Sequence, residues 1–473
     1  MGFRITTNMM MNSYRYNLQG STKKLSDARD MVLTQRNFNS YAEDPAAATQ
    51  EFRLRRDYYN TYSQLNNTKN VYSKYNTAWN NLAGIVENLS DATARVASIR
   101  GNNGTAGESR SALAIVLRET SESVVHAMNQ KLGDQFIFAG NDGLNVPFEW
   151  RGEDLYYRGI NVNAGSVEKP MAADPGWMGP NGTLKPANMT DDEKAWYDYY
   201  THATDVKPDT TEPGWLSDPA VVGNPLTDEA KGWISYYKHE AGKPTAKEPA
   251  WGDLNANGVP EKMPATSTDP VEKGWIAYYN DQANVAKLKQ MADEQLYIDL
   301  GMGLAEHTAN NAVNGSYFNS ALAGVDFMGY GTDEDGDPKN LSLIMRELAD
   351  VFQAWDEDID PQGYNPDLAG PSAQGLSSKE LEDKAFRLMD KLKAAQEHIT
   401  EKWDELDAQS VFLVTNQERL ETQMTDTNTQ ILDISQVDLA DAITNFSWQQ
   451  YCYNAALKIG NQLLSQSLID YMS

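Results

Sequence analysis

The acidic run Asp333-Glu334-Asp335-Gly336-Asp337 groups side chains that could hold a metal ion. Calcium binds oxygen ligands from alternating loop positions, and in an EF-hand the glycine follows three such ligands. Gly336 follows only two alternating carboxylates, so it comes too early for that loop. We therefore predict a hairpin turn between two strands at this position, and no metal site.

Candidate catalytic residues are few and scattered. The five histidines are widely separated, and His239-Glu240 is not followed by the second histidine that a zinc-binding helix requires. The one cysteine, Cys452, cannot form an internal disulfide, and no basic neighbour is suggested that would activate its thiol. Gly301-Met302-Gly303 lacks the third glycine of a dinucleotide-binding loop. The sequence therefore predicts no catalytic residue and no cofactor, and the protein is not expected to be an enzyme.

Aromatic residues form a threefold repeat between residues 165 and 290. Each unit has a tryptophan followed by tyrosines three and four positions later, and a second tryptophan beside a proline lies upstream. This spacing puts the three rings on one helix face, which is typical of a buried stripe in an array of small helical units. We predict core packing, while a platform that stacks on sugar rings stays an alternative. The nine residues are Trp196, Tyr199, Tyr200, Trp233, Tyr236, Tyr237, Trp275, Tyr278 and Tyr279.

A helix-capping residue stands six positions before each of these tryptophans. These residues are Thr190, Thr227 and Asp269. Thr190 with Glu193, and Asp269 with Glu272, have the spacing of a capping box. We therefore expect a short helix to begin after each capping residue.

The elements that must position these motifs are long helices from both ends of the chain. Two apolar positions per heptad, kept over several heptads, indicate helices paired along their length. We expect a first long helix that is broken near Gly101, and a second from about residue 109 to 133. In the first helix one seam is Tyr58, Leu65, Tyr72, Trp79 and Val86, and the other is Tyr75, Leu82, Leu89 and Val96.

The C-terminal part of the chain repeats this pattern. Its seam is Ala385, Leu392, Ile399, Leu406, Leu413 and Leu420, with Leu381, Leu388 and Ala395 at the companion positions. Matching heptads so far apart in sequence predict one antiparallel bundle that is built from both termini.

The middle of the chain differs in composition from both ends. All of the 19 prolines except Pro45 lie there. Short strands are predicted at 136–140, 155–160, 295–300 and 324–328. The predicted fold class is therefore α+β: a long, coiled-coil-like antiparallel helical bundle with a β-rich outer domain that carries the repeat insertion. The predicted divisions are terminal helices at 1–45 and 430–473, the bundle at 46–138 and 376–429, the outer domain at 139–375, and the insertion at 165–290.

Net charge and hydropathy limit the partners. A formal charge of −27 opposes binding to nucleic acid or to anionic lipid. No run of about 20 apolar residues is present to span a membrane. The N-terminus lacks the features of a cleaved secretory signal. We expect no nucleic-acid partner and no membrane partner.

Short motifs near both ends resemble the flagellin superfamily of bacterial flagellar proteins. The run Arg4-Ile5-Thr6-Thr7-Asn8 resembles the start of its hook-associated protein 3 family, which forms the hook–filament junction. Residues 39–48 resemble the superfamily's turn after its first helix, with Ala47 where glycine is usual. Residues 136–148 resemble the segment in which the superfamily's chain leaves the bundle, and residues 297–303 resemble the strand by which it returns. Residues 464–471 resemble the ending of the junction proteins more than that of filament flagellin. The resemblance covers about residues 1–165 and 290–473.

The resemblance implies a structural function. Such proteins are exported unfolded through the flagellar secretion apparatus with an uncleaved N-terminal signal, and they assemble outside the cell through their terminal helices. Implied partners are other copies in a ring, the hook-side junction protein, flagellin, and an export chaperone on residues 439–468. Filament flagellin and a glycan-binding surface adhesin are the alternative functions, and an enzyme within the insertion is the weakest.

We predict the assembly interface from the apolar positions of the terminal helices. The same positions can equally form an intramolecular core. They are Leu18, Leu25, Val32, Leu439, Ile443, Phe446, Leu457, Leu464 and Leu468.

Overall fold

The computed structural model describes residues 7–38, 40–101, 107–177, 189–217, 227–301, 317–354 and 373–472. The chain divides into two compact units. Unit 1 comprises Met1–Ser73, Ile298–Phe318 and Gln409–Ser473, and unit 2 comprises Lys74–Tyr297 and Asn319–Ala408. Helices α2 (Pro45–Gly101) and α10 (Ser378–Ser435) contribute residues to both units.

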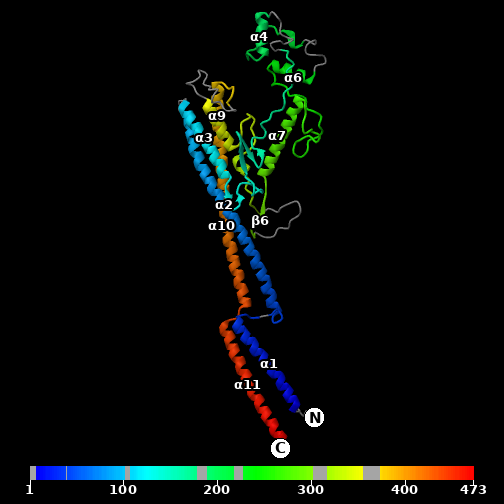
Figure 1. Ribbon diagram of the computed structural model, residues 1–473, viewed down its shortest axis with the longest axis vertical. Coiled ribbons are helices and arrows are strands. Elements are labelled where there is room, and N and C mark those ends of the chain that lie inside the picture. Colours follow the sequence, from blue (N-terminus) through cyan, green and yellow to red (C-terminus); the bar gives the residue numbers. More distant parts are fainter. Residues whose placement is uncertain are drawn as a thin grey trace. The chain divides into compact units, whose positions relative to one another are not determined.

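The terminal helices pair in unit 1. Helix α1 (Thr7–Thr34) packs along α11 (Leu439–Met472), and the chain termini lie at the same end of this pair (Figure 1). At the other end Arg36 forms an antiparallel bridge with Gln436, and the Asn37 side-chain amide donates to the carbonyls of Ile434 and Gln436. The predicted pairing of the two chain ends is confirmed.

Capping residues set where the long helices begin. The Asp44 carboxylate accepts hydrogen bonds from the backbone nitrogens of Ala46 and Ala47, with Pro45 as the first residue of α2. Asp438 caps α11 in the same way. Ser377 and Glu380 form a reciprocal capping box at the start of α10. Each long helix thus begins where its sequence provides an acceptor for free backbone N–H groups.

The heptad seams form the core that α2 and α10 share in each unit. The six predicted seam residues of α10 are all at most 2% exposed. On α2 the seam from Tyr75 to Val96 is buried, whereas Tyr72, Trp79 and Val86 are only half-buried. The companion positions on α2 are instead Val71, Ala78, Ile85 and Ala92. Leu65 of the other predicted seam is buried as expected, and Trp79 stacks on Trp403 of α10. Beyond Leu65 the most buried positions lie one residue earlier than predicted, because alanine is a weak periodicity signal beside the larger aromatic residues.

Unit 1 also contains buried polar contacts between α2, α10 and the segment that returns to them. The buried Asn416 amide donates to Thr68 Oγ1 at 3.2 Å and to the Leu300 carbonyl at 3.0 Å. Gln64 donates to the Asp299 carboxylate. Because a slipped heptad would leave these groups without partners, they specify the register of the pair as well as its stability.

Unit 2 adds helices and two small sheets to its part of α2 and α10. Helix α3 (Gly107–Met128) packs against α9 (Leu341–Ala354). Strands β1 (Lys131–Leu132) and β2 (Gln135–Phe136) pair, and β3 (Phe148–Arg151), β4 (Asp154–Tyr157) and β5 (Ile160–Asn161) form an antiparallel meander. A third sheet pairs β6 (Tyr297–Asp299) with β7 (Tyr317–Asn319), and most of its residues belong to unit 1.

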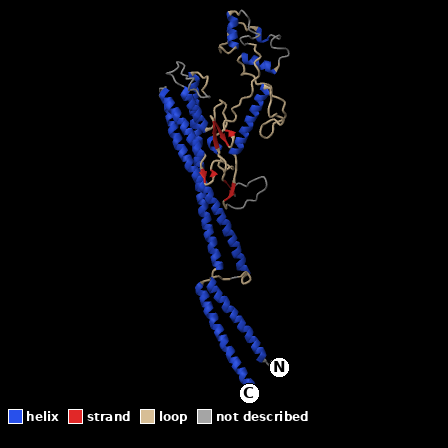
Figure 2. Cartoon of the chain, in the orientation of Figure 1, coloured by secondary structure: helices blue, strands red, loops and turns tan. Residues whose placement is uncertain are grey.

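The predicted β-rich outer domain is not seen in the described residues. Between 139 and 375 they form more helix than strand, as Figure 2 shows, and the remaining helices there are α4 (Asp191–Tyr200), η1 (Gly214–Ser217), α6 (Asp228–Tyr237) and α7 (Pro270–Ala292). The strand predicted at 324–328 is wrong, because this run is helix α8 (Gly324–Met328). Gly324 lies against the Phe148 ring and donates to the Phe138 carbonyl, and Phe327 packs edge-on against Phe138. A run of five residues is too short for periodicity to separate helix from strand.

Candidate functional site

Helices α1 and α11 approach closely along a seam of small residues. Ala28 and Ala442 are buried. A Cβ atom at Gly460 would collide with the Tyr14 hydroxyl group, so this glycine allows the tyrosine to lie across α11. The pair is thus held by small residues and by large side chains that pack over them.

The predicted interface residues lie on the sides of this seam. Leu18, Leu25, Val32 and Phe446 are half-buried. Leu439, Ile443 and Leu457 stay 44%, 47% and 41% exposed. Leu464 and Leu468 lie outside the residues whose side chains are described. Hence the α1–α11 contact covers part of the predicted surface and leaves part of it open.

A second apolar stripe on α11 faces away from α1, and the sequence analysis missed it. Trp448, Tyr451 and Ile459 are 62%, 67% and 54% exposed. At about 100° per residue Tyr451 lies opposite Ala442 and Gly460, whereas Trp448 and Ile459 lie about a third of a turn from them. The Trp448 and Tyr451 rings stack with centroids 6.0 Å apart. The three residues are spaced three and eight positions apart, which places them on one side of α11 but does not indicate which side α1 covers. A helix that has a second exposed apolar stripe, beside the face that already binds a neighbour, is often covered there as well.

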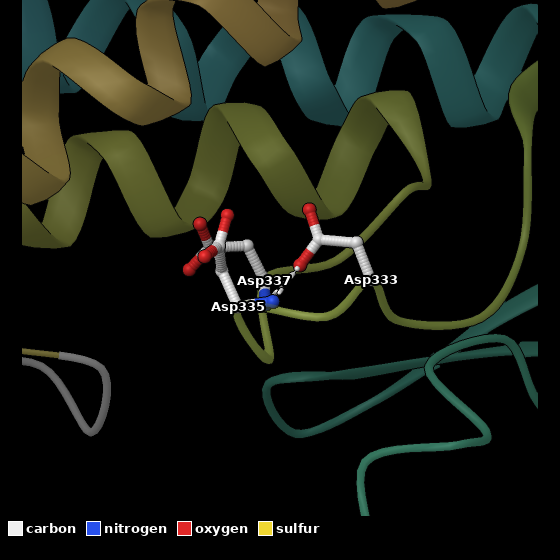
Figure 3. Close-up of side chains that lie close together, drawn as sticks. All are labelled: Asp333, Asp335 and Asp337. Carbon is white, nitrogen blue, oxygen red and sulfur yellow. Dashed lines mark hydrogen bonds between the residues drawn. The ribbon is translucent and has the colours of Figure 1, made fainter.

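The acidic turn in unit 2 is the one group of His, Cys, Asp or Glu side chains among the described residues with metal-ligand spacing, formed by Asp333, Asp335 and Asp337. Figure 3 shows the three side chains on one loop, where Asp333 Oδ1 accepts from the backbone nitrogens of Asp335 and Asp337. A single Thr332–Pro338 bridge closes the turn. The predicted turn is present, but it does not connect two full strands.

Two basic side chains from α10 bind these carboxylates. Lys391 Nζ lies 2.5, 3.2 and 2.5 Å from oxygens of Asp333, Asp335 and Asp337. Arg387 Nε is 2.6 Å from Asp337 Oδ2. Burial opposes charge on Asp337, but hydrogen bonds from Arg387 and Lys391 outweigh it and hold the pKa of this carboxyl below its ordinary value. An ammonium group therefore supplies the positive charge that a metal ion would bring.

A neutral copy of this turn occurs at Asn255-Ala256-Asn257-Gly258-Val259. Its backbone bonds match, since Asn255 N donates to the Val259 carbonyl and Gly258 N donates to the Asn255 carbonyl. Asn255 Oδ1 accepts from Asn257 N and Val259 N, as Asp333 Oδ1 does in the acidic turn. The side-chain-to-backbone bonds alone therefore shape the loop, and the shape itself requires no cation.

The aromatic repeats form helices where they were predicted. Thr190 and Glu193 complete the capping box of α4, and Thr227 caps α6. Asp269 caps α7, but Glu272 bonds Ser267 instead of closing the predicted box. Seven of the nine repeat aromatic side chains are buried, while Tyr236 and Tyr278 are half-buried. This burial favours core packing over a stacking platform.

An acidic residue accepts a hydrogen bond from each repeat helix, and the sequence analysis overlooked these residues. The last tyrosine of each helix donates its hydroxyl proton to a carboxylate: Tyr200 to Glu212 at 2.6 Å, Tyr237 to Asp174 at 2.8 Å, and Tyr279 to Glu248. Burial, and then the bond to Glu248, raise the pKa of Tyr279 to about 12. Each acid directly precedes the proline of an upstream Pro-x-Trp motif, which was the missed signal.

Two segments that lie just before these motifs pair with each other and contact the repeat helices. Residues 170–172 and 244–246 pair in antiparallel fashion, with Ala172 N donating to the Pro244 carbonyl and Ala246 N to the Pro170 carbonyl. The Pro244 ring lies on Gly232 of α6, and the Pro170 ring lies on Gly274 of α7. Helix α4 has Ala195 at the equivalent position. Glycine at this position thus allows a proline ring to pack directly on the helix backbone.

No protein-family model and no curated protein sequence matches this chain. The functional argument therefore depends on the geometry above and on the terminal motifs.

We predict that Gly232→Ala destabilises the insertion. A Cβ atom there would lie 2.5 Å from Pro244 Cβ, and such overpacking costs about 1–3 kcal/mol. Gly84→Ala on α2 is the matched control, because its added Cβ meets nothing within 4 Å and should stabilise by about 0.5–1 kcal/mol. Urea unfolding followed by near-ultraviolet circular dichroism measures both. Stabilisation by both substitutions would contradict the proline contact.

We also predict that Lys391→Met destabilises the protein at pH 7 by about 2 kcal/mol, because Asp337, 3% exposed, loses one of its two cations. The folded-state pKa of Asp333 and Asp337 is lowered, so their contribution is present above the unfolded pKa of about 4 and is lost as pH falls through the folded values. The difference between variant and wild type should therefore shrink below pH 4. Denaturant unfolding from pH 7 to pH 2.5 measures it.

Lys393→Met is the control for this experiment. Lys393 lies on the same helix, and among the described residues it pairs only with the exposed Glu397, so little change is expected. A Lys391→Met effect as small as that of the control, or one that does not depend on pH, would show that the internal cation does not stabilise the turn.

Proposed function

We propose that this chain is a structural subunit of the bacterial flagellum that forms a ring at the junction of hook and filament. The terminal motifs and the antiparallel pairing of both chain ends support this function. In the proposal, residues 1–45 and 430–473 are assembly helices, 46–138 and 376–429 are the bundle, 139–375 is the outer part, and 165–290 is its insertion.

The outward stripe of α11 is the observation that carries the proposal. It exposes Trp448, Tyr451 and Ile459 on a helix that already binds α1 through another part of its surface. Burial of apolar area contributes about 25 cal/mol per Å², and aromatic residues are enriched at protein interfaces. A second chain that covers this stripe would gain that contribution.

Low charge on α11 supports the same conclusion. The chain as a whole has a formal charge of −27. Yet α11 has only three charged residues in its 34, Asp441, Lys458 and Asp470. Because burying an unpaired charge is costly, a helix with so few charges is suited to be enclosed by neighbours. The strong charge elsewhere disfavours unspecific association of the rest of the surface.

In this proposal the partners are other copies of the chain, the hook-side junction protein and flagellin, outside the cell. Export occurs in the unfolded state, with a chaperone on residues 439–468. A chaperone there would cover the stripe before assembly. Filament flagellin is the nearest alternative and would use the same helices. The glycan-binding alternative gains no support, because most of the repeat rings are buried.

We predict that Tyr451→Glu weakens self-association at least about tenfold, because it places a charge in the stripe that a neighbour must bury. Sedimentation velocity over a concentration series measures this effect. Gln423→Glu adds the same charge to an exposed position on α10, outside the proposed assembly helices, and should change little.

Far-ultraviolet circular dichroism must show the same helix content in both variants. Equal association of the two variants and the wild type would eliminate the stripe as an assembly surface.

We predict that gold-labelled antibody against residues 165–290 marks a narrow band between hook and filament on intact flagella, as viewed by electron microscopy. Label along the whole filament would favour the flagellin alternative. Flagella without any label, from cells whose denatured flagellar fraction does bind the antibody, would indicate that the insertion is covered by neighbours. If the antibody detects the protein only away from flagella, the proposed function is wrong.

A further inference from the structure

The first two aromatic repeats meet through a stack of four rings. The His202 and His239 rings lie face to face, with centroids 3.8 Å apart and planes at 13°. Tyr236 stacks on the outer face of His202 at 4.3 Å, and Tyr199 stacks on the outer face of His239 at 4.2 Å. The order Tyr236–His202–His239–Tyr199 alternates the two repeats, so each repeat provides one tyrosine and one histidine.

The hydrogen bonds of the stack are reciprocal. His202 Nε2 lies 3.0 Å from the Tyr236 carbonyl oxygen, and His239 Nε2 lies 2.7 Å from the Tyr199 carbonyl oxygen. A carbonyl only accepts, so each Nε2 carries its proton in the neutral ring as well as in the charged ring. The next proton must therefore bind Nδ1, and binding it breaks neither bond.

Both histidines occupy a backbone conformation that disfavours them. Their φ angles are 59° for His202 and 57° for His239. Each histidine directly follows the C-cap residue of its helix, Thr201 or Lys238. The next residue closes the turn: Ala203 N donates to the Asp198 carbonyl, and Glu240 N donates to the Ser235 carbonyl. Glycine is the usual residue at this position. Because backbone geometry alone would favour glycine, the two imidazole rings must contribute through their side chains.

The charges around the stack are unequal. Asp205 Oδ1 lies 3.7 Å from His239 Nδ1, so one imidazolium has a counter-ion. His202 has no such ion pair among the described residues. Lys243 lies over the Tyr236 ring, Lys238 pairs with Glu212, and the Tyr199 hydroxyl group donates to the Lys238 carbonyl. If both rings were protonated, the two imidazolium groups would lie at stacking distance, and Asp205 is the one carboxylate in the described part of the chain that forms an ion pair with either ring to balance the two positive charges.

We propose that the first two repeats form an acid-labile pair, in which protonation of both His202 and His239 separates their rings and loosens α4 from α6. Acid is the trigger because imidazole is the side chain that gains a charge most readily on mild acidification. The third repeat has Asp281 in place of the histidine, and this carboxylate accepts from Gly165 and Val167 backbone nitrogens. The transition is therefore confined to the first two repeats and does not depend on the proposed flagellar function.

Near-ultraviolet circular dichroism of the full-length chain, titrated from pH 8 to pH 5 at low salt, tests the proposal. We expect a change in the aromatic signal with the steepness of two protons, while far-ultraviolet helix content stays constant. His202→Asn and His239→Asn should each abolish most of this change, because a single imidazolium faces no like charge. Asparagine tolerates positive φ, so the helix ends are preserved. His126→Asn, at an exposed site on α3, is the control and should titrate like the wild type.

Salt provides a test that needs no variant. His202 is exposed, so 1 M salt should screen the repulsion and move the midpoint to lower pH. A wild-type signal that is flat from pH 8 to pH 5, or a change that persists in the double Asn variant, would overturn the proposal.

Discussion

The heptad seam of α10 is the contact on which the rest of the fold depends. An isolated helix in water is only marginally stable, and most of its stability in a protein comes from packing of its apolar face. Leu392, Leu413 and Leu420 are fully buried, which requires α2 to lie alongside. Because α2 and α10 are separated by almost the whole middle of the chain, everything between them must leave the bundle and return. The irregular segments and the insertion are consequences of that requirement.

Short polar side chains hold these irregular segments in place. Asp333 and Asn255 shape two turns by accepting backbone hydrogen bonds, and Asn416 fixes the return segment. The acidic version of the turn then binds Lys391 and Arg387, which ties it to the bundle helix. The polar network thus connects loop conformation to the helical frame.

The terminal helix pair differs from the rest of the frame in how much it leaves uncovered. Along α10 the apolar seam is closed, whereas α11 keeps a second stripe with Trp448 and Tyr451 in solvent. An uncovered stripe on a helix with few charges is the physical basis for proposing assembly. The insertion differs, because most of its repeat aromatic rings are buried within it. The hydroxyl groups of Tyr200 and Tyr237 donate to carboxylates of the same insertion.

Periodicity and capping signals determined much of this protein from the sequence alone. The seven-residue seam from Ala385 to Leu420, the pairing of the chain ends and the three repeat helices were predictable, because their signals lie within one helix or recur over many turns. Segments of five residues were not: 324–328 became helix α8 through contacts with Phe138 and Phe148 that are distant in sequence. The outward face of α11, the Lys391 contacts and the His202–His239 stack were likewise decided only by tertiary structure. Each depends on which side chains from separate segments come within a few ångströms of one another, and spacing along one segment carries no information about that.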